Sequence, residues 1–133
     1  MLLVRHASAG DREEWEGDDR LRPLDAKGRA RAGELVSLLG NYEVARILSS
    51  PALRCVQTVE PLAHAIDVRT ELLDELAEEN QATAGAELVR ALAGRDVVIC
   101  GHGGLEDALP EHPKWKKGTV FVVDGDLAVD EVL

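Results

Sequence analysis

The sequence is poor in positive charge. It has 15 lysine and arginine residues against 25 aspartate and glutamate residues, which gives a net charge of −10 over 133 residues. A chain of this charge repels polyanions, which argues against nucleic acid or an anionic membrane as its main partner. An anionic ligand would therefore need a local positive pocket.

Cysteines are scarce as well. Cys55 and Cys100 belong neither to a CxxC motif nor to a Cys/His spacing that is typical of zinc sites. Both lie in apolar or helical surroundings, so we interpret them as small buried thiols. The sequence indicates no metal site and no cofactor.

Long apolar runs are missing too. The N-terminal run ends at Arg5, which makes it too short for a signal peptide or a membrane span. The chain has no internal repeat, linker or low-complexity tract, and its hydrophobic content of 45% is enough for a continuous core. We therefore predict a single cytoplasmic domain over residues 1–133 with one site, in an oligomeric state that the sequence does not indicate.

Apolar strands alternate with helices along the chain. The predicted strands are residues 1–4, 44–49, 68–70 and 96–100, the predicted helices are residues 26–39, 52–65 and 83–93, and a hairpin is predicted over residues 119–129. Asp25 is expected to cap the first helix, and Pro61 to kink or divide the second. This order predicts a three-layer α/β/α sandwich whose sheet is mostly parallel with an antiparallel edge.

Two of the predicted strands deliver a histidine into a turn of small residues. The N-terminal strand ends in Arg5-His6, and the strand at residues 96–100 ends in Gly101-His102. Arg54 is expected in the first turn of the helix that follows Ser50-Pro51. Ligands of open α/β sheets bind at the carboxyl ends of the strands, so these side chains are expected at one rim.

Arginine and histidine without an obligatory carboxylate form an anion site, and the fork of an arginine suits phosphate oxygens. Arg54 would stand at the positive end of a helix, where a cation is unfavourable unless an anion binds. A neutral histidine held there can attack phosphorus, after which water cleaves the phosphoenzyme without a metal. Metal binding by His6 and His102 with an acidic partner is an alternative that the two arginines disfavour.

Three sequence blocks resemble a known family. They are Leu3-Val4-Arg5-His6-Ala7, Ser49-Ser50-Pro51-x-x-Arg54-x-x-Gln57-Thr58 and Ile99-Cys100-Gly101-His102. In this order they resemble the histidine phosphatase superfamily, also called phosphoglycerate mutase-like, over nearly the whole chain. The resemblance implies that His6 is the phosphorylated nucleophile, while Arg5, Arg54 and His102 hold the phosphoryl group. Ala7 stands where the family usually has glycine.

Two branches of that superfamily are similar to this chain. The short length and the block Arg22-Pro23-Leu24-Asp25-x-x-Gly28 look most like the compact SixA-type phosphohistidine phosphatases. The stretch Gly17-Asp18-Asp19, the block from Arg54 to Leu62 and Lys116-Lys117-Gly118-Thr119 resemble the phosphatase-like domain that follows a Nudix domain in MutT-type bacterial proteins. The second resemblance implies a nucleotide-derived substrate, with Lys116 and Lys117 as candidate contacts.

An ordinary phosphate ester needs an acid that protonates its leaving group. The resemblance implies an acidic residue after the third strand, and the candidates are Glu71, Asp74, Glu75, Glu78 and Glu79. We favour Glu75, because Leu73-Asp74-Glu75-Leu76 resembles the acidic segment of the family. A phosphohistidine substrate needs this acid less, because its imidazole can leave already protonated.

Other charged residues and histidines have plainer interpretations. His64 and His112 are expected to be structural. Arg20 and Arg22 either extend the anion pocket or form surface ion pairs.

The sequence thus predicts a metal-independent phosphomonoesterase that works through a phosphohistidine at His6. Protein phosphohistidine is the leading substrate class, and a nucleotide or another small phosphate ester is the alternative. A weakly active phosphate-binding regulatory module is the third interpretation, which the presence of both His6 and His102 disfavours.

Overall fold

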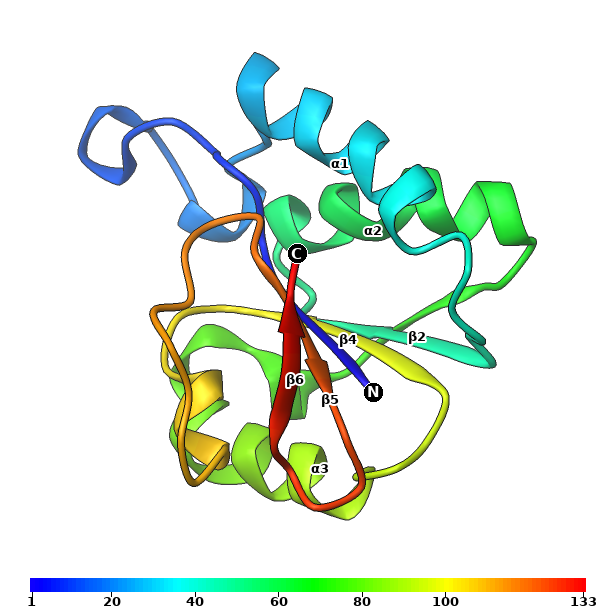
Figure 1. Cartoon of the computed structure of the whole chain (residues 1–133). Helices are drawn as coiled ribbons and strands as arrows, with labels where there is room; N and C mark the ends of the chain where they lie inside the picture. Colours follow the sequence, from blue (N-terminus) through cyan, green and yellow to red (C-terminus); the bar gives the residue numbers. More distant parts are fainter.

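The computed structural model describes residues 1–133, and its strands form one six-stranded sheet (Figure 1). The strands are β1 (Leu2–Arg5), β2 (Arg46–Ser49), β3 (Thr70–Leu72), β4 (Val97–Gly101), β5 (Val120–Val123) and β6 (Val129–Val132). Their order across the sheet is β3-β2-β4-β1-β5-β6. The first four strands run parallel, whereas β5 pairs antiparallel with β1 and β6 antiparallel with β5. The predicted parallel sheet with an antiparallel edge is confirmed.

The helices cover both faces of the sheet. They are α1 (Ala26–Leu38), α2 (Leu53–Ile66) and α3 (Ala86–Ala91). In Figure 1, α1 and α2 lie side by side above the strands, and α3 lies below them. This arrangement confirms the predicted three layers. None of the helices has the length and apolar character needed to cross a membrane.

The two central strands are apolar on both faces, because each face packs against helices. Leu2 and Val98 belong to the buried cluster under α1 and α2, while Leu3 and Ile99 belong to the cluster under α3. Burial of each such side chain contributes about 1.5–3 kcal/mol. The two cores hold β1 and β4 next to each other, and these strands carry the two histidines of interest.

The start of α1 is tied to the loop that follows β1. Asp25 caps the helix by accepting a hydrogen bond from the Gly28 amide at 2.8 Å, as expected, and also accepts from the Ser8 hydroxyl at 2.6 Å. The Ser8 hydroxyl and the amides of Gly28 and Gly10 lower the pKa of Asp25 to about 2. A Cβ atom at Gly28 would lie 2.0 Å from the Ser8 carbonyl oxygen, so this close approach requires glycine.

Pro61 was expected to kink or divide α2, and of these two outcomes the division is wrong. The helix continues from Leu53 to Ile66 through the proline. Val59 and Leu62, on either side of Pro61, are both buried in the core under α2. Packing of this continuous apolar face outweighs the one backbone hydrogen bond that the proline removes.

Several element boundaries differ from those expected. Strand β3 covers Thr70–Leu72 rather than residues 68–70. The Asp124 carboxylate accepts hydrogen bonds from the amides of Asp126 and Ala128, so the hairpin turn extends through Ala128 and β6 begins at Val129. The expected helix over residues 83–93 is a π-helical turn over Gln81–Gly85 followed by the short α3.

Candidate active site

The structure brings the four predicted phosphate-binding residues to one rim of the sheet. Arg5 and His6 lie at the end of β1, His102 follows β4, and Arg54 lies in the first turn of α2. The His6 amide donates to the Gly101 carbonyl oxygen at 3.1 Å, which continues the ladder between β1 and β4 to the point where the two histidines leave it. The two imidazole centroids are 5.4 Å apart. Strand pairing thus sets the distance between the histidines.

His6 is buried and neutral. Its Nδ1 lies 2.8 Å from the Ala7 carbonyl oxygen, so Nδ1 carries the hydrogen and Nε2 keeps its lone pair. Burial, with smaller contributions from the charges of His102, Arg54 and Arg5, lowers the pKa of His6 to about 3. An unprotonated Nε2 beside cationic groups is the state that a phosphorus nucleophile requires.

His102 is fixed by residues from three other elements. Its Nε2 lies 2.8 Å from the Ser50 hydroxyl, its Nδ1 lies 3.4 Å from Nη2 of Arg54, and its amide donates to the Gln81 side chain at 2.8 Å. The sulfur of Cys55 is 3.6 Å from Nε2. Cys55 and Cys100 are both free and buried, as the sequence predicts.

Arg54 is almost completely buried, at 1% exposure, and is surrounded by acceptors. Its Nη1 donates to the Asp19 carbonyl oxygen at 2.9 Å, and its Nη2 lies 3.2 Å from the carboxylates of both Asp19 and Glu78. Arg12 also donates to Glu78 and lies near Asp19. The positive start of α2 therefore carries a cation whose charge is balanced by two acids.

The structure moves the acidic candidate from Glu75 to Glu78. Two cavities lie around the histidines, one lined by His6 and His102 and the other by Arg54 and His102. Glu78 lines both of them, whereas Glu75 is exposed and lines neither. Leu76 is fully buried, and Gln81 donates to its carbonyl oxygen, which directs the preceding Glu75 outward. Glu75 therefore does not lie at the site where the acid was expected, and the identity of the proton donor stays a prediction.

Glu78 is held in its ionised form. Burial raises the pKa of this carboxyl, but the hydrogen bond from Arg12 and the charges of His102, Arg12 and Arg54 outweigh burial and place the pKa below its ordinary value. In the free protein, Glu78 is therefore a carboxylate that binds cations rather than a proton donor.

The cavity in front of His6 has a volume of about 470 Å³ and no hydrophobic lining residue. Among the arginines left open by the sequence, Arg22 lines it and donates to the Ala9 carbonyl oxygen at 2.7 Å. Arg20 lines the second cavity, together with Arg54 and His102, and also forms an exposed ion pair with Asp18. Lys117 lines the cavity, but Lys116 does not.

Other polar groups at the site were not predicted. They are Arg12, Asp19 and Gln81, and all three lie in irregular or short-turn segments where periodicity gives no signal. The acid–base pairing across the site joins Arg54 to Asp19 and Glu78, which are far apart in the sequence, so it needs the three-dimensional structure.

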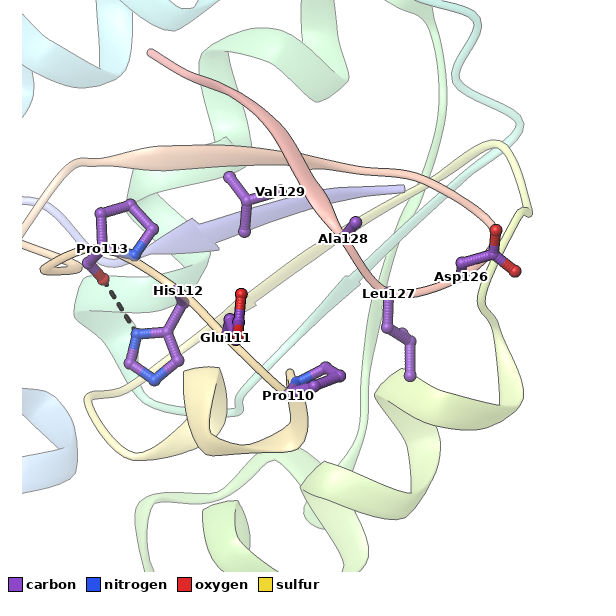
Figure 2. Close-up of a pocket in the computed structure, with 8 residues that line it drawn as sticks. All are labelled: Pro110, Glu111, His112, Pro113, Asp126, Leu127, Ala128 and Val129. Carbon is purple, nitrogen blue, oxygen red and sulfur yellow. Dashed lines mark hydrogen bonds between the residues drawn. The ribbon is translucent and has the colours of Figure 1, made fainter.

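The two remaining histidines lie elsewhere. His64 is exposed on α2. Figure 2 shows His112 in a separate groove, between residues 110–113 and the β5–β6 turn. The groove has a volume of about 620 Å³, and Nδ1 of His112 lies 2.9 Å from the Pro113 carbonyl oxygen. This groove shares no lining residue with the His6 cavity. The structure contains no group of three or more His, Cys, Asp or Glu side chains placed to hold a metal ion.

Comparisons with known proteins agree with this geometry. The sequence profile of the histidine phosphatase superfamily (branch 1) matches residues 1–85. A protein of Mycolicibacterium smegmatis named 8-oxo-(d)GTP phosphatase is 36% identical over 146 residues, which cover 96% of this chain and 45% of that protein. The chain therefore spans less than half the length of this relative.

Solved structures share the fold over almost the whole chain. The protein histidine phosphatase SixA complexed with tungstate has a TM-score of 0.80 and 20% identity, with 99% of this chain and 94% of that chain covered. A protein of Agrobacterium tumefaciens, provisionally designated the phosphohistidine phosphatase SixA, has a TM-score of 0.75 and 25% identity, with 99% and 95% covered. These likenesses confirm the expected phosphoglycerate mutase-like fold.

Proposed function

Because this chain belongs to the histidine phosphatase superfamily and is a phosphatase, we propose that it is a metal-independent phosphomonoesterase in which His6 is the nucleophile. The observation that carries the proposal is the neutral imidazole of His6, whose Nδ1 is bonded to the Ala7 carbonyl oxygen while its Nε2 has no hydrogen-bond partner. Arg5 and His102 line the same cavity as His6, Arg54 lies 3.4 Å from His102, and in this proposal all three bind the phosphoryl oxygens.

The reaction has two steps. Nε2 of His6 attacks phosphorus, a P–N bond forms, and the bond from phosphorus to the leaving group breaks with its electron pair on the leaving atom. Water then attacks the phosphohistidine, the P–N bond breaks, and inorganic phosphate leaves a neutral His6. The arginines stabilise negative charge on the oxygens of phosphorus in both steps.

Glu78 is the proposed proton carrier. A bound phosphoryl group competes with its carboxylate for Arg54, from which Glu78 is 3.2 Å away. The dianionic phosphoryl group then lies beside Glu78, which has lost its contact with Arg54. Because a nearby like charge raises the pKa of a carboxyl, the pKa of Glu78 rises. Substrate binding therefore converts Glu78 from a carboxylate into an acid, and the attacking water returns the proton to it in the second step.

Two substrate classes have support. Protein phosphohistidine is favoured by the ionised state of Glu78, because a protonated imidazole leaves without an acid, and by the likeness to the Agrobacterium tumefaciens protein. A nucleotide or another small phosphate ester is favoured by the 36% identity to a protein named 8-oxo-(d)GTP phosphatase. Neither nucleic acid nor a membrane is proposed as a partner.

The test is phosphate release, measured with chelator present, from a phosphohistidine-bearing protein, a nucleotide and an aryl phosphate. Wild-type protein should release phosphate from at least one member of the panel, His6→Ala should release none, and the preferred member identifies the substrate class. Release that survives in His6→Ala, or that chelator abolishes, contradicts the proposal. A folded wild-type protein that binds phosphate but releases none would instead be a phosphate-binding module.

A further inference from the structure

The main chain on both sides of Lys117 is hydrogen-bonded to the strand end that carries Arg5 and His6, and its exposed side chain lines the His6 cavity. The next residue, Gly118, donates its amide to the carbonyl oxygens of both Arg5 and His6, at 3.1 and 3.0 Å. Two residues before Lys117, the carbonyl oxygen of Trp115 accepts from Nη1 of Arg5 at 2.8 Å. Gly118 has a φ of +79°, which lets the chain turn back into β5 at that point. The position of Lys117 is therefore set by the same strand end that presents His6.

The ammonium group of Lys117 is not neutralised. Arg12 and Arg22, which line the same cavity, pair with Asp19, and Arg12 also pairs with Glu78. Lys117 makes no ion pair and no side-chain hydrogen bond. The other acid that lines the cavity, Asp11, uses its carboxylate to accept a hydrogen bond from the Glu13 amide. In a chain of net charge −10, an unpaired cation beside the nucleophile is a local departure from the overall charge.

The proposed phosphoryl site already has enough cations without Lys117. In the proposed function Arg5, Arg54 and His102 bind the phosphoryl group, and the guanidinium groups of the two arginines supply the positive charge that it requires. Lys117 is left for a second anionic group of the same substrate. The cavity of about 470 Å³ has no hydrophobic lining residue, so it suits a chain of phosphates better than a nucleobase or an apolar peptide side chain.

We propose that Lys117 forms a second phosphate subsite, which selects substrates whose scissile terminal phosphate is joined to another phosphate, as in a nucleoside diphosphate. This inference rests on the proposed function, since it places the terminal phosphoryl group at His6. Attack by Nε2 breaks the bond between the terminal phosphorus and the bridging oxygen, and the electron pair stays on that oxygen of the departing nucleoside monophosphate. Lys117 stabilises that negative charge, and water then releases phosphate from His6.

The ionised Glu78 agrees with this assignment. A departing phosphate needs little protonation near neutral pH, whereas an alkoxide needs a proton. Arg12 and Arg54 keep the pKa of Glu78 below its ordinary value. Cleavage of a phosphoanhydride therefore depends less than cleavage of an alkyl ester on the proposed change of Glu78 from a carboxylate into an acid.

The experiment compares adenosine diphosphate with adenosine monophosphate on the wild type, on Lys117→Gln and on the matched control Lys116→Gln. Lys116 is the exposed neighbour that does not line the cavity. Lys117→Gln should lower kcat/KM for the diphosphate about tenfold, the size expected for one charge-assisted contact. The monophosphate should change less than about twofold, and Lys116→Gln should leave both substrates unchanged.

A second measurement does not depend on turnover. Inorganic pyrophosphate should bind the wild type about tenfold more tightly than inorganic phosphate does, and Lys117→Gln should remove this difference. Equal loss for both ligands, or no loss, overturns the subsite. An effect of Lys117→Gln confined to phosphohistidine peptides with a flanking glutamate overturns it in favour of an acidic protein partner. If His6→Ala keeps full activity, the proposed function fails, whereas a His6-dependent enzyme without a Lys117 effect fails this inference alone.

Discussion

The two arginines of the His6 site hold their positive charge in different ways. Arg54 is buried with its Nη2 3.2 Å from each of two carboxylates, Asp19 and Glu78. Arg5 has no carboxylate partner and donates instead to the Trp115 carbonyl oxygen. One side of the site is thus neutralised by acids from two loops, and the other side keeps an uncompensated charge.

This difference teaches how a strongly acidic chain keeps an anion site. On the Arg54 side, a phosphoryl group must compete with carboxylates that already occupy the guanidinium. On the side of Arg5 and Lys117, the field attracts the ligand without competition. The phosphoryl group is therefore expected to contact Arg5 first and then to replace the Glu78 carboxylate as the partner of Arg54.

The difference between the two arginines is tested most directly by replacing each of them in turn. Arg5→Ala and Arg54→Ala should each lower kcat/KM about 100- to 1,000-fold, because each removes a preorganised donor to the phosphoryl oxygens. The two variants should differ in stability. Arg54→Ala removes the most buried cation that Asp19 and Glu78 share and leaves them with only Arg12 and Arg22. We expect a cost of about 2 kcal/mol, below the range for fully buried pairs because both acids keep access to water.

Urea denaturation of the two variants measures that difference in stability, and phosphate release measures the activity. Arg5→Ala should lose less stability than Arg54→Ala, since Arg5 pairs with no acid. Equal destabilisation would mean that the carboxylates around Arg54 are not held by it. Activity within twofold of the wild type in either variant would remove that arginine from the phosphoryl site.

Glu78 pairs with Arg54 and also lines the cavity that contains Arg5, and its replacement should have the next largest effect. Glu78→Gln should lower turnover of an ordinary alkyl phosphate about 100-fold, because it removes the proton donor. The loss should be smaller for phosphohistidine or a phosphoanhydride, whose leaving groups need less protonation. Glu75→Gln is the matched control, since Glu75 is exposed and away from the cavity. Loss of activity in Glu75→Gln with none in Glu78→Gln would restore the original preference.

The sequence predicts the Arg5 side of the site better than the Arg54 side. Arg5, His6 and His102 follow apolar strands, so their meeting at one rim follows from the rule for parallel sheets. Asp19 and Glu78 lie in segments of short 3-10 turns, whose direction depends on which neighbours are buried. Leu76 decides that Glu75 points outward, and its complete burial cannot be read from a single apolar residue in an acidic stretch.

The fold shows the same division. The strand and helix order was predictable because hydrophobic periodicity determines which faces are buried. The continuity of α2 through Pro61 was not, because it depends on the core contacts of Val59 and Leu62. Local propensity favoured a break there, and tertiary packing prevailed.

Burial of His6 between the two sides predicts a pH dependence of stability. The folded pKa of about 3 lies below the ordinary histidine value of 6.5, so between these values the unfolded chain binds a proton that the folded chain does not. Stability then falls as the pH is lowered from neutrality, by about 1.4 kcal/mol per pH unit below 6.5. From pH 7 to pH 5, the wild type should lose about 2 kcal/mol more than His6→Asn. Parallel urea-unfolding curves of both proteins at the two pH values measure this, and equal losses would show that His6 titrates normally.

The smallest expected effect concerns how His102 is held next to Arg54. The Ser50 hydroxyl is 2.8 Å from Nε2 of His102, and Ser50→Ala leaves that buried nitrogen without this partner. The loss of about 1 kcal/mol in ring positioning corresponds to about a fivefold lower kcat/KM. Ser49→Ala is the matched control, because the neighbouring Ser49 hydroxyl donates to the Ser50 carbonyl oxygen and does not contact His102. If both variants lose activity equally, Ser50 acts through the general packing of the strand end. In that case the difference between the Arg5 and Arg54 sides does not extend to His102.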